Sequence, residues 1–326
     1  MELPAALRQA VDAALAGVPL VDLSAAAQRL SNRYRGEIRD GALHISDDLA
    51  ARAYLATRLP ATFAAISAVF DAIAEMRPDF MPHSLLDIGA GPGTAMWAAA
   101  GVWPIVDAQM IERSNAIRSW GETLAAAAPP QTIAWTNADL AGGLSGCDRR
   151  DLVVIAYVLN ELAPAAADQL LDQAWEKSGD MLVIVEPGTP AGWQRILNAR
   201  ARLLEVGGHV IAPCPHAAAC PLSELDWCHF SRKVARTRIH RLVKDAEVPW
   251  EDEKFIYLAV SREKGRSIQG RVIAPPKAAS GRVALKLCRS DGQAGERLFT
   301  RREGEAYKTA RRLGWGDALP AEADQP

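Results

Sequence analysis

A short segment with one acid and three glycines is the first candidate for chemistry. Asp87, Gly89, Gly91 and Gly93 follow the apolar run 84–88 and precede an Ala- and Trp-rich stretch of helical composition. Glycine lets a backbone turn tightly and approach a ligand, because no Cβ stands in the way. The spacing is GxGxG rather than GxGxxG and an acid precedes it. This pattern favours S-adenosylmethionine (SAM) over a dinucleotide, whose pyrophosphate would have to be seated.

Two further acids lie where a nucleotide site of this kind needs them. Glu112 ends the next strand-like run, 108–112, where a carboxylate can accept both ribose hydroxyls. Asp139 lies further on, where an acid can bind the adenine amino group. The alternative is a glycine-rich turn with unrelated acids nearby, but three acids at expected strand ends favour the SAM-type site. The predicted cofactor-binding residues are Asp87, Gly89, Gly91, Gly93, Glu112 and Asp139.

Asn160 and Glu161 are the candidates for the catalytic side of such a site. They follow the buried apolar run 152–159, where methyltransferases place groups that face the substrate. The segment lacks the Asp/Asn-Pro-Pro-Tyr motif that holds the exocyclic amine of a base. Both residues equally suit a second role, in which they cap the following helix and line the pocket. The two interpretations stay open.

Three cysteines lie within 15 residues of one another. Cys214, Cys220 and Cys228 have the spacing C-x5-C-x7-C, and in a chain without a secretory signal they are better metal ligands than disulfide partners. Thiolates suit either zinc or an iron–sulfur cluster, and the spacing chooses neither. A fourth ligand is needed, and the candidates are Cys288, Cys147, His216 and His229. The alternative is a set of incidental buried thiols.

A concentrated basic segment follows the cysteines directly. Residues 231–244 hold six Lys or Arg side chains and no acid. A second basic group, with Trp315 beside it, spans 301–312. Clustered arginines suit phosphate backbones, so we expect RNA here, the alternative being a solvated helix face. The predicted RNA-binding residues are Arg232, Lys233, Arg236, Arg238, Arg241 and Lys244.

The composition excludes several classes of protein. A chain of 326 residues with 49% apolar residues predicts about two domains with a sizeable core. The net charge of −2 means that any affinity for nucleic acid must come from a local patch. No apolar run approaches 18 uncharged residues, so we expect no membrane span. Early acids such as Asp12 and Asp22 argue against a signal or transit peptide.

The elements that position these residues follow from the hydrophobic period. Residues 1–80 show helical spacing and predict a helical N-terminal unit. Within 81–264, continuous apolar runs alternate with helical stretches, which is typical of a parallel sheet covered on both faces, with the cysteine and basic segment 213–244 inserted. Short strand-like runs in 265–326 predict a small β-rich C-terminal module.

Several of these segments resemble a known family, the methyltransferase-like assembly factors of the mitochondrial small ribosomal subunit and their bacterial relatives. The resemblance covers about 45–315. It is carried by Tyr-Leu-Ala-Thr-Arg-Leu-Pro-Ala-Thr at 54–62, Leu-Asp-Ile-Gly-Ala-Gly-Pro-Gly-Thr at 86–94 and Val-Glu-Pro-Gly-Thr-Pro at 185–190. The Cys-Pro-His at 214–216 and the Trp-Cys-His-Phe at 227–230 are its more specific parts.

The resemblance implies a Rossmann-like class I SAM-methyltransferase fold and binding to small-subunit ribosomal RNA or a pre-ribosomal particle. It also implies a [4Fe–4S] cluster, with zinc as the alternative metal. Its ligands, carried over residue by residue, are Cys214, Cys220, Cys228 and Cys288. The short N-terminus suggests a bacterial, cytoplasmic member, and we expect a monomer. The alternatives are an active SAM-dependent rRNA methyltransferase and a zinc-stabilised small-molecule methyltransferase.

Overall fold

The computed structural model describes residues 2–38, 42–138, 143–223 and 225–321. The chain divides into two compact units that interleave along the sequence. The first unit comprises Met1–Phe70, Met81–Leu182 and Arg232–Glu253, and the second comprises Asp71–Phe80, Val183–Ser231 and Lys254–Pro326. The domain boundaries expected at residues 80 and 264 stay predictions.

The N-terminal region is helical, as predicted. It consists of α1 (Ala5–Leu15), α2 (Leu20–Arg35), α3 (Asp48–Thr57) and α4 (Leu59–Met76). Asp47 starts α3 because its side chain accepts a hydrogen bond from the Ala50 N–H at 2.8 Å. The helical structure is interrupted at Arg58, between the end of α3 and the start of α4. The interruption lies two residues before Pro60, as expected near a proline.

Helix α4 is long and apolar enough to cross a membrane by length and composition, with 18 residues and a mean hydropathy of 1.4. However, 78% of this segment is buried inside the protein. A helix that is apolar on all sides and covered by protein is a core helix.

A mainly parallel sheet carries the candidate nucleotide site. Its strands are β1 (Ser84–Ile88), β2 (Asp107–Ile111), β3 (Thr132–Thr136), β4 (Arg150–Ala156), β5 (Ser178–Pro187), β6 (His209–Ala212), β7 (Phe230–Ala235) and β8 (Trp250–Ser261). In the described part of the chain their order is β3-β2-β1-β4-β5-β8-β6, with β7 pairing with β8. Strands β1, β2, β3 and β4 pair in parallel, whereas β6 and β8 are antiparallel.

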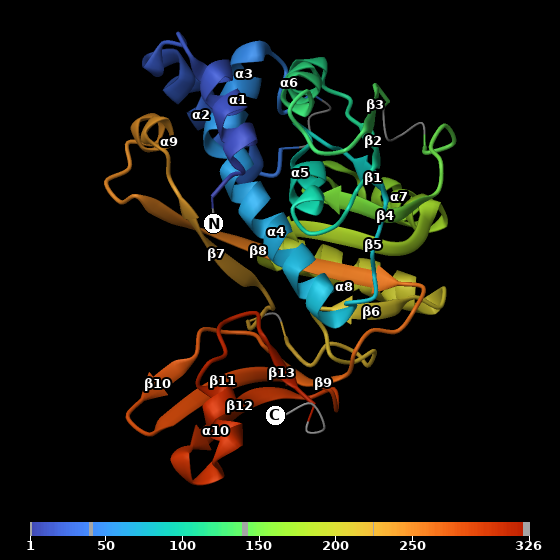
Figure 1. Cartoon of the computed structure of the whole chain (residues 1–326), viewed down its shortest axis with the longest axis vertical. Coiled ribbons are helices and arrows are strands. Elements are labelled where there is room, and N and C mark those ends of the chain that lie inside the picture. Colours follow the sequence, from blue (N-terminus) through green and yellow to red (C-terminus); the bar gives the residue numbers. More distant parts are fainter. Residues whose placement is uncertain (1, 39–41, 139–142, 224, 322–326) are drawn as a thin grey trace. The chain divides into compact units, whose positions relative to one another are not determined.

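This strand order confirms the predicted Rossmann-like class I SAM-methyltransferase fold. The order reverses between β1 and β4, which makes the carboxyl ends of these two strands the switch point of a doubly wound sheet. The connecting helices are α5 (Thr94–Ala100), α6 (Asn115–Ala125), α7 (Pro164–Lys177) and α8 (Pro190–Glu205). In Figure 1, α5 lies in front of the sheet and α7 behind it, as expected for crossovers that run in opposite directions.

The basic segment forms a strand and a short helix rather than one helix. After β7, the helix α9 (Arg238–Val243) leads into the start of β8. Thr237 caps α9 by accepting a hydrogen bond from the His240 N–H at 3.1 Å. We call residues 232–251 the basic arm.

The C-terminal region is β-rich, as predicted. It contains β9 (Ile268–Val272), β10 (Lys277–Ala279), β11 (Arg282–Arg289), β12 (Ala294–Thr300), β13 (Ala318–Pro320) and the helix α10 (Glu305–Ala310). These strands appear as the orange-to-red ribbons of Figure 1. Its own apolar core includes Val272, Leu285, Leu287 and Phe299. Strand β11 pairs with β9 in a register that sets Cys288 opposite Arg271.

Candidate functional site

The glycine loop after β1 has a backbone that only glycine adopts easily. Gly89, Gly91 and Gly93 all have positive φ, at 73°, 55° and 82°. A Cβ on Gly89 would lie 2.4 Å from a methyl group of Val158, which follows β4. The loop and the end of β4 therefore meet at the switch point, where doubly wound sheets bind their ligands.

Asp87 and Glu112 face this loop in different ways. Asp87 is 2% exposed and its Oδ2 has no hydrogen-bond partner. Burial, with the nearby charge of Glu112 as the second cause, raises the pKa of Asp87 to about 8. Glu112 accepts the Gly91 N–H at 2.9 Å and the Ser114 N–H at 2.7 Å, while burial raises its pKa. Glu112 thus ties the loop to the N-terminus of α6.

The structure separates the two catalytic candidates. Asn160 and Glu161 lie in the short 3-10 helix Leu159–Glu161, where Asn160 is buried and Glu161 is exposed. Helix α7 begins with Ala163 as its N-cap residue and has no side-chain capping bond, so the expected capping role is wrong. Asp139 lies outside the described residues.

Sequence reasoning missed a buried polar group beside this site. Arg58 donates two hydrogen bonds to Glu253, at 3.0 and 3.3 Å, and the Tyr157 hydroxyl donates to the same carboxylate at 3.3 Å. The charge of Glu253 raises the pKa of Arg58, and burial raises that of Tyr157. Tyr157 has φ of 60°, which is rare for a non-glycine residue and ends β4 three residues earlier than the predicted run 152–159.

The four cysteines carried over from the resemblance lie in the second unit and influence one another. We call Cys214, Cys220, Cys228 and Cys288 the cysteine cluster. Burial raises the pKa of Cys228 well above its usual value, and the charges of the other three thiols raise it further. Burial, followed by the charges of Cys214 and Cys220, raises the pKa of Cys288 to about 12. The thiol 60 residues downstream therefore lies close to the local three.

The four thiols do not form a closed ligand set in the structure. Across the described residues, no group of three or more His, Cys, Asp or Glu side chains is arranged to hold a metal ion. His216 also enters the cluster, with its Nε2 atom 3.3 Å from the Cys288 sulfur. Cys147 is buried and belongs to the first unit.

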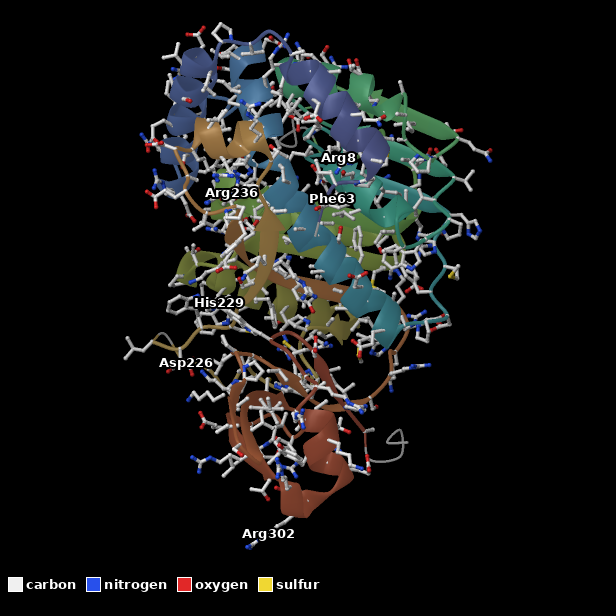
Figure 2. The ribbon with its side chains drawn as sticks, turned by 60° about the vertical axis from the view of Figure 1, so that its left-hand side comes forward. Arg8, Phe63, Asp226, His229, Arg236 and Arg302 are labelled. Carbon is white, nitrogen blue, oxygen red and sulfur yellow. The ribbon has the colours of Figure 1, made fainter. Side chains whose placement is uncertain are left out.

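Aromatic side chains surround the loop that carries the cysteines. The His229 ring stacks on Trp227, with ring centroids 5.4 Å apart, and meets the edge of Trp315 at 5.0 Å. Trp315 donates its indole N–H to the His229 carbonyl at 3.0 Å. Trp315, grouped with the C-terminal basic residues in the sequence, is therefore a packing partner of this loop. The Arg302 side chain extends away from the ribbon (Figure 2).

Two buried arginines beside the cysteines were also missed. Arg271 is 1% exposed and donates to the carbonyls of Pro213 and Gly316, each at 3.1 Å. Arg200 is 5% exposed and donates to the carbonyls of His216 and Ala218 at 2.7 and 2.8 Å. The only signal in the sequence is an arginine inside the apolar run 270–274.

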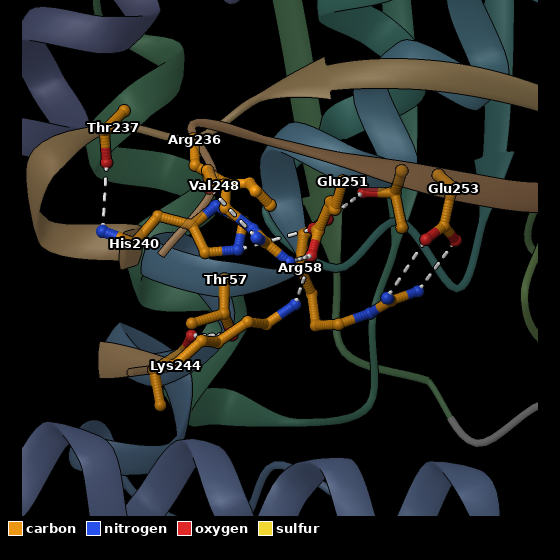
Figure 3. A network of polar contacts seen from close by, with 11 residues as sticks. Thr57, Arg58, Arg236, Thr237, His240, Lys244, Val248, Glu251 and Glu253 are labelled. Carbon is orange, nitrogen blue, oxygen red and sulfur yellow. Dashed lines mark hydrogen bonds and ion pairs between the residues drawn. The ribbon is translucent and has the colours of Figure 1, made fainter. Parts of the chain in front are cut away.

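The basic arm is partly neutralised by the acid at its C-terminal end, Glu251. Glu251 accepts hydrogen bonds from Arg236 at 3.1 Å and from Lys244 at 2.8 Å, and His240 lies 3.4 Å away (Figure 3). Burial lowers the pKa of His240 to about 4. Strand pairing brings Glu251 back beside Arg236 and Lys244, so these two predicted RNA-binding residues already share a carboxylate. Their role in RNA binding stays a prediction.

The other basic side chains of the arm differ in exposure. Lys233, Arg238 and Arg241 are exposed, whereas Arg232 is half-buried. The Lys233 ammonium lies over the ring of Trp250 at 5.0 Å, and Trp250 is itself 44% exposed. The arm thus presents cations next to an accessible aromatic ring.

Comparison with known proteins decides the family. Residues 48–320 match the family described as "Mitochondrial small ribosomal subunit Rsm22". The chain belongs to the Rsm22 family. The resemblance predicted from the glycine loop and the cysteine motifs is therefore confirmed.

Curated relatives of this Rsm22-family chain have names that refer to mitochondria. The human protein named "Ribosome assembly protein METTL17, mitochondrial" is 30% identical over 287 residues, which cover 82% of this chain and 62% of the relative. The Schizosaccharomyces pombe "Rsm22-cox11 tandem protein 2, mitochondrial" is 22% identical over 323 residues, covering 83% of this chain and 43% of the relative. The chain therefore spans about two-fifths to three-fifths of the length of these relatives.

These relatives overturn one prediction. The expected bacterial, cytoplasmic location is wrong, since the curated relatives are mitochondrial proteins. The early acids that argued against a transit peptide are no guide to location for this Rsm22-family chain.

A solved structure of an O-methyltransferase family protein from Burkholderia thailandensis is 14% identical, with a TM-score of 0.45. The match covers 76% of this Rsm22-family chain and 72% of the Burkholderia protein. The fold of this chain is assigned from its own strand order, described above.

Proposed function

We propose that this Rsm22-family chain binds small-subunit ribosomal RNA during ribosome assembly. The observation that carries the proposal is the family match over residues 48–320, which includes the basic arm and the cysteine cluster. METTL17, a relative over 82% of the chain, is named as a ribosome assembly protein. The fold supplies the scaffold, and the exposed cations of the arm supply the contact with RNA.

The arm supports phosphate binding through a smaller set of residues than the sequence suggested. Lys233, Arg238 and Arg241 are exposed, whereas Arg236 and Lys244 share the carboxylate of Glu251. A cation already paired with a carboxylate gains less from a phosphate, because the new contact replaces an existing one. Trp250 beside Lys233 offers a face on which an unpaired base can stack.

The arm makes a prediction about salt dependence. Replacing Lys233, Arg238 and Arg241 together by alanine removes three phosphate contacts. The slope of log affinity against log salt should fall by about 2, and the affinity near physiological salt by about tenfold or more. Binding of a small-subunit rRNA fragment, measured by fluorescence anisotropy between low and moderate salt, tests this.

The matched control removes three exposed charges elsewhere, with Arg8, Lys277 and Arg282 replaced by alanine. The control should keep most of the wild-type slope. Equal slopes for the two triple variants would mean that RNA binds elsewhere or binds through net charge alone.

We also propose that the glycine loop binds SAM, with the cofactor held between the loop and the end of β4. Asp87 would receive the ligand's ammonium group, and Glu112 would accept the ribose hydroxyls with the lone pairs that Gly91 and Ser114 leave free. The unpartnered Oδ2 of the buried Asp87 fits a cationic ligand. When bound, SAM would supply an activated methyl group.

A titration separates cofactor binding from methyl transfer. Glu112→Ala should weaken SAM binding at least about tenfold, since two hydrogen bonds to a charged group are lost. Glu122→Gln, on the exposed side of α6, should bind like the wild type. Calorimetry measures this, and a tritium-transfer assay on immature small subunits follows.

We expect the wild-type protein to bind SAM in the calorimeter but to transfer no tritium label to RNA. Labelled rRNA would favour the active methyltransferase instead, with Asn160 and the strained Tyr157 at the end of β4 as its substrate side. Absence of SAM binding would contradict both alternatives, SAM binding without methyl transfer and an active methyltransferase.

We propose, finally, that the cysteine cluster holds a metal centre, with the [4Fe–4S] cluster favoured over zinc. Four thiols lie within one another's electrostatic range, with Cys288 buried and the other three half-buried. They fit such a centre, because a bound cation relieves the repulsion among thiolates. The centre would tie the loop 213–231 to β11 through Cys288. Iron, sulfide and zinc quantification after anaerobic purification distinguishes the two metals, and zinc without RNA binding would favour a small-molecule methyltransferase.

A further inference from the structure

The two buried arginines beside the cysteine cluster lack a carboxylate to balance them. Arg271 and Arg200 are both almost inaccessible to solvent, and they donate hydrogen bonds to backbone carbonyls. Within the described ranges, neither guanidinium forms an ion pair with Asp or Glu. Each also keeps a buried nitrogen without a partner, Nε of Arg200 and one terminal nitrogen of Arg271.

This arrangement is unusual for a stable protein. Burying an unpaired cation costs free energy, so buried charges are normally paired or bind a metal centre of opposite sign. Arg77, the other buried arginine among the described residues, obeys that rule. It is 3% exposed and pairs with Asp79 at 3.0 Å and with Glu263 at 3.3 Å. Two unbalanced guanidiniums in one place therefore indicate an anionic partner.

The geometry identifies the partner as the cysteine cluster. The charge of Arg200 acts on Cys214, and the hydrogen bond from Arg200 to the His216 carbonyl holds the residue whose Nε2 atom lies 3.3 Å from the Cys288 sulfur. Arg271 lies opposite Cys288 in the β9–β11 register, and its charge acts on Cys214 and Cys228. The charges of the two guanidiniums thus act on Cys214, Cys228 and Cys288.

We propose that the two positive charges of Arg200 and Arg271 balance the metal centre, which carries two negative charges when it is loaded. The inference rests on the metal centre proposed above. Both a [4Fe–4S] cluster in its doubly positive state and a zinc ion carry two positive charges. With four thiolates, either becomes a centre with two negative charges. Two guanidiniums balance that charge, which lets the centre sit in a buried site.

The charge balance has consequences for retention and reduction. A positive charge near thiolate ligands stabilises the loaded state, and groups around the ligands commonly change metal affinity about 10–100-fold. For an iron–sulfur cluster, the same charge stabilises the reduced form, which carries one more negative charge. Arg200 and Arg271 would therefore slow metal loss and raise the reduction potential.

The test compares three variants of the full chain, purified anaerobically. Arg200→Gln removes the charge, Arg200→Lys keeps it, and Arg282→Gln removes an exposed charge from the strand that carries Cys288. We expect R200Q to lose its metal to a chelator about 10–100-fold faster than the wild type. R200K and R282Q should stay within a few-fold of the wild type. For a cluster, the midpoint potential of R200Q should shift to more negative values.

A second readout separates charge balance from a merely structural role. In the metal-free protein the unbalanced guanidinium is a cost, so metal-free R200Q should unfold at the same or a higher urea concentration than the metal-free wild type. Earlier unfolding of metal-free R200Q, or equal metal loss from R200Q and R200K, would overturn the proposal. The proposal would also be overturned if R200Q had the metal content, the rate of metal loss to the chelator and the midpoint potential of the wild type. A wild type that takes up no metal would instead refute the proposed metal centre itself.

Discussion

Cys228→Ser is expected to abolish metal binding and to destabilise the second unit. The charges of all three other cysteines act on Cys228, so its loss would remove a ligand from the proposed metal centre. The ligands come together only when the chain folds, so the free energy of metal binding adds to the free energy of unfolding. Cys228→Ser should therefore lower the free energy of unfolding by about 5 kcal/mol. This is below the ~10–16 kcal/mol of zinc-dependent peptides, since the second unit has an apolar core of its own.

The measurement is metal content together with urea unfolding of the anaerobically purified protein. Cys147→Ser is the matched control, because Cys147 is also a buried thiol but lies in the first unit. The control should keep its metal. A Cys228→Ser protein that retains a full complement of metal would show that another donor, such as His216 beside Cys288, completes the site.

Asp87→Asn is expected to stabilise the protein at neutral and alkaline pH. With the pKa of Asp87 at about 8, the folded protein holds a proton that the unfolded chain releases near pH 4. The unfolded state therefore binds fewer protons between about pH 4 and pH 8, and stability falls as the pH rises through that window. Asparagine removes this dependence. The gain at pH 8 should be about 2–5 kcal/mol, and it should vanish near pH 4.

Urea unfolding at several pH values from 4 to 8 checks this expectation. Asp12→Asn, an exposed position on α1, is the control and should follow the wild-type curve. Parallel curves for Asp87→Asn and the wild type would mean that Asp87 is ionised in the folded protein. Loss of SAM binding in Asp87→Asn would show that the Asp87 carboxylate also contributes to ligand binding, in addition to destabilising the fold.

Local patterns in the sequence were sufficient for the framework of the fold. The apolar run 84–88 and the glycines after it predicted β1 and its loop, and all three glycines have the positive φ that such a loop needs. The end of β4 was predicted three residues too late. Tyr157 leaves the strand with a left-handed backbone, and composition alone does not reveal such a turn when no glycine marks it.

Partners distant in the chain explain what the patterns missed. The basic run at 231–244 contains no acid, but β8 returns Glu251 to Arg236 and Lys244. The Arg58–Glu253 pair joins residues nearly two hundred positions apart.

The sequence by itself determined the class of fold, the glycine loop and the local group of three cysteines, because period, glycine placement and short spacing are properties of neighbouring residues. Only the tertiary structure decided which charges are balanced. It brought Cys288 toward the local cysteines, and it buried Arg200 and Arg271, which form no ion pair with Asp or Glu among the described residues. Burial and electrostatic pairing depend on segments that meet only when the chain folds, and no local pattern encodes them.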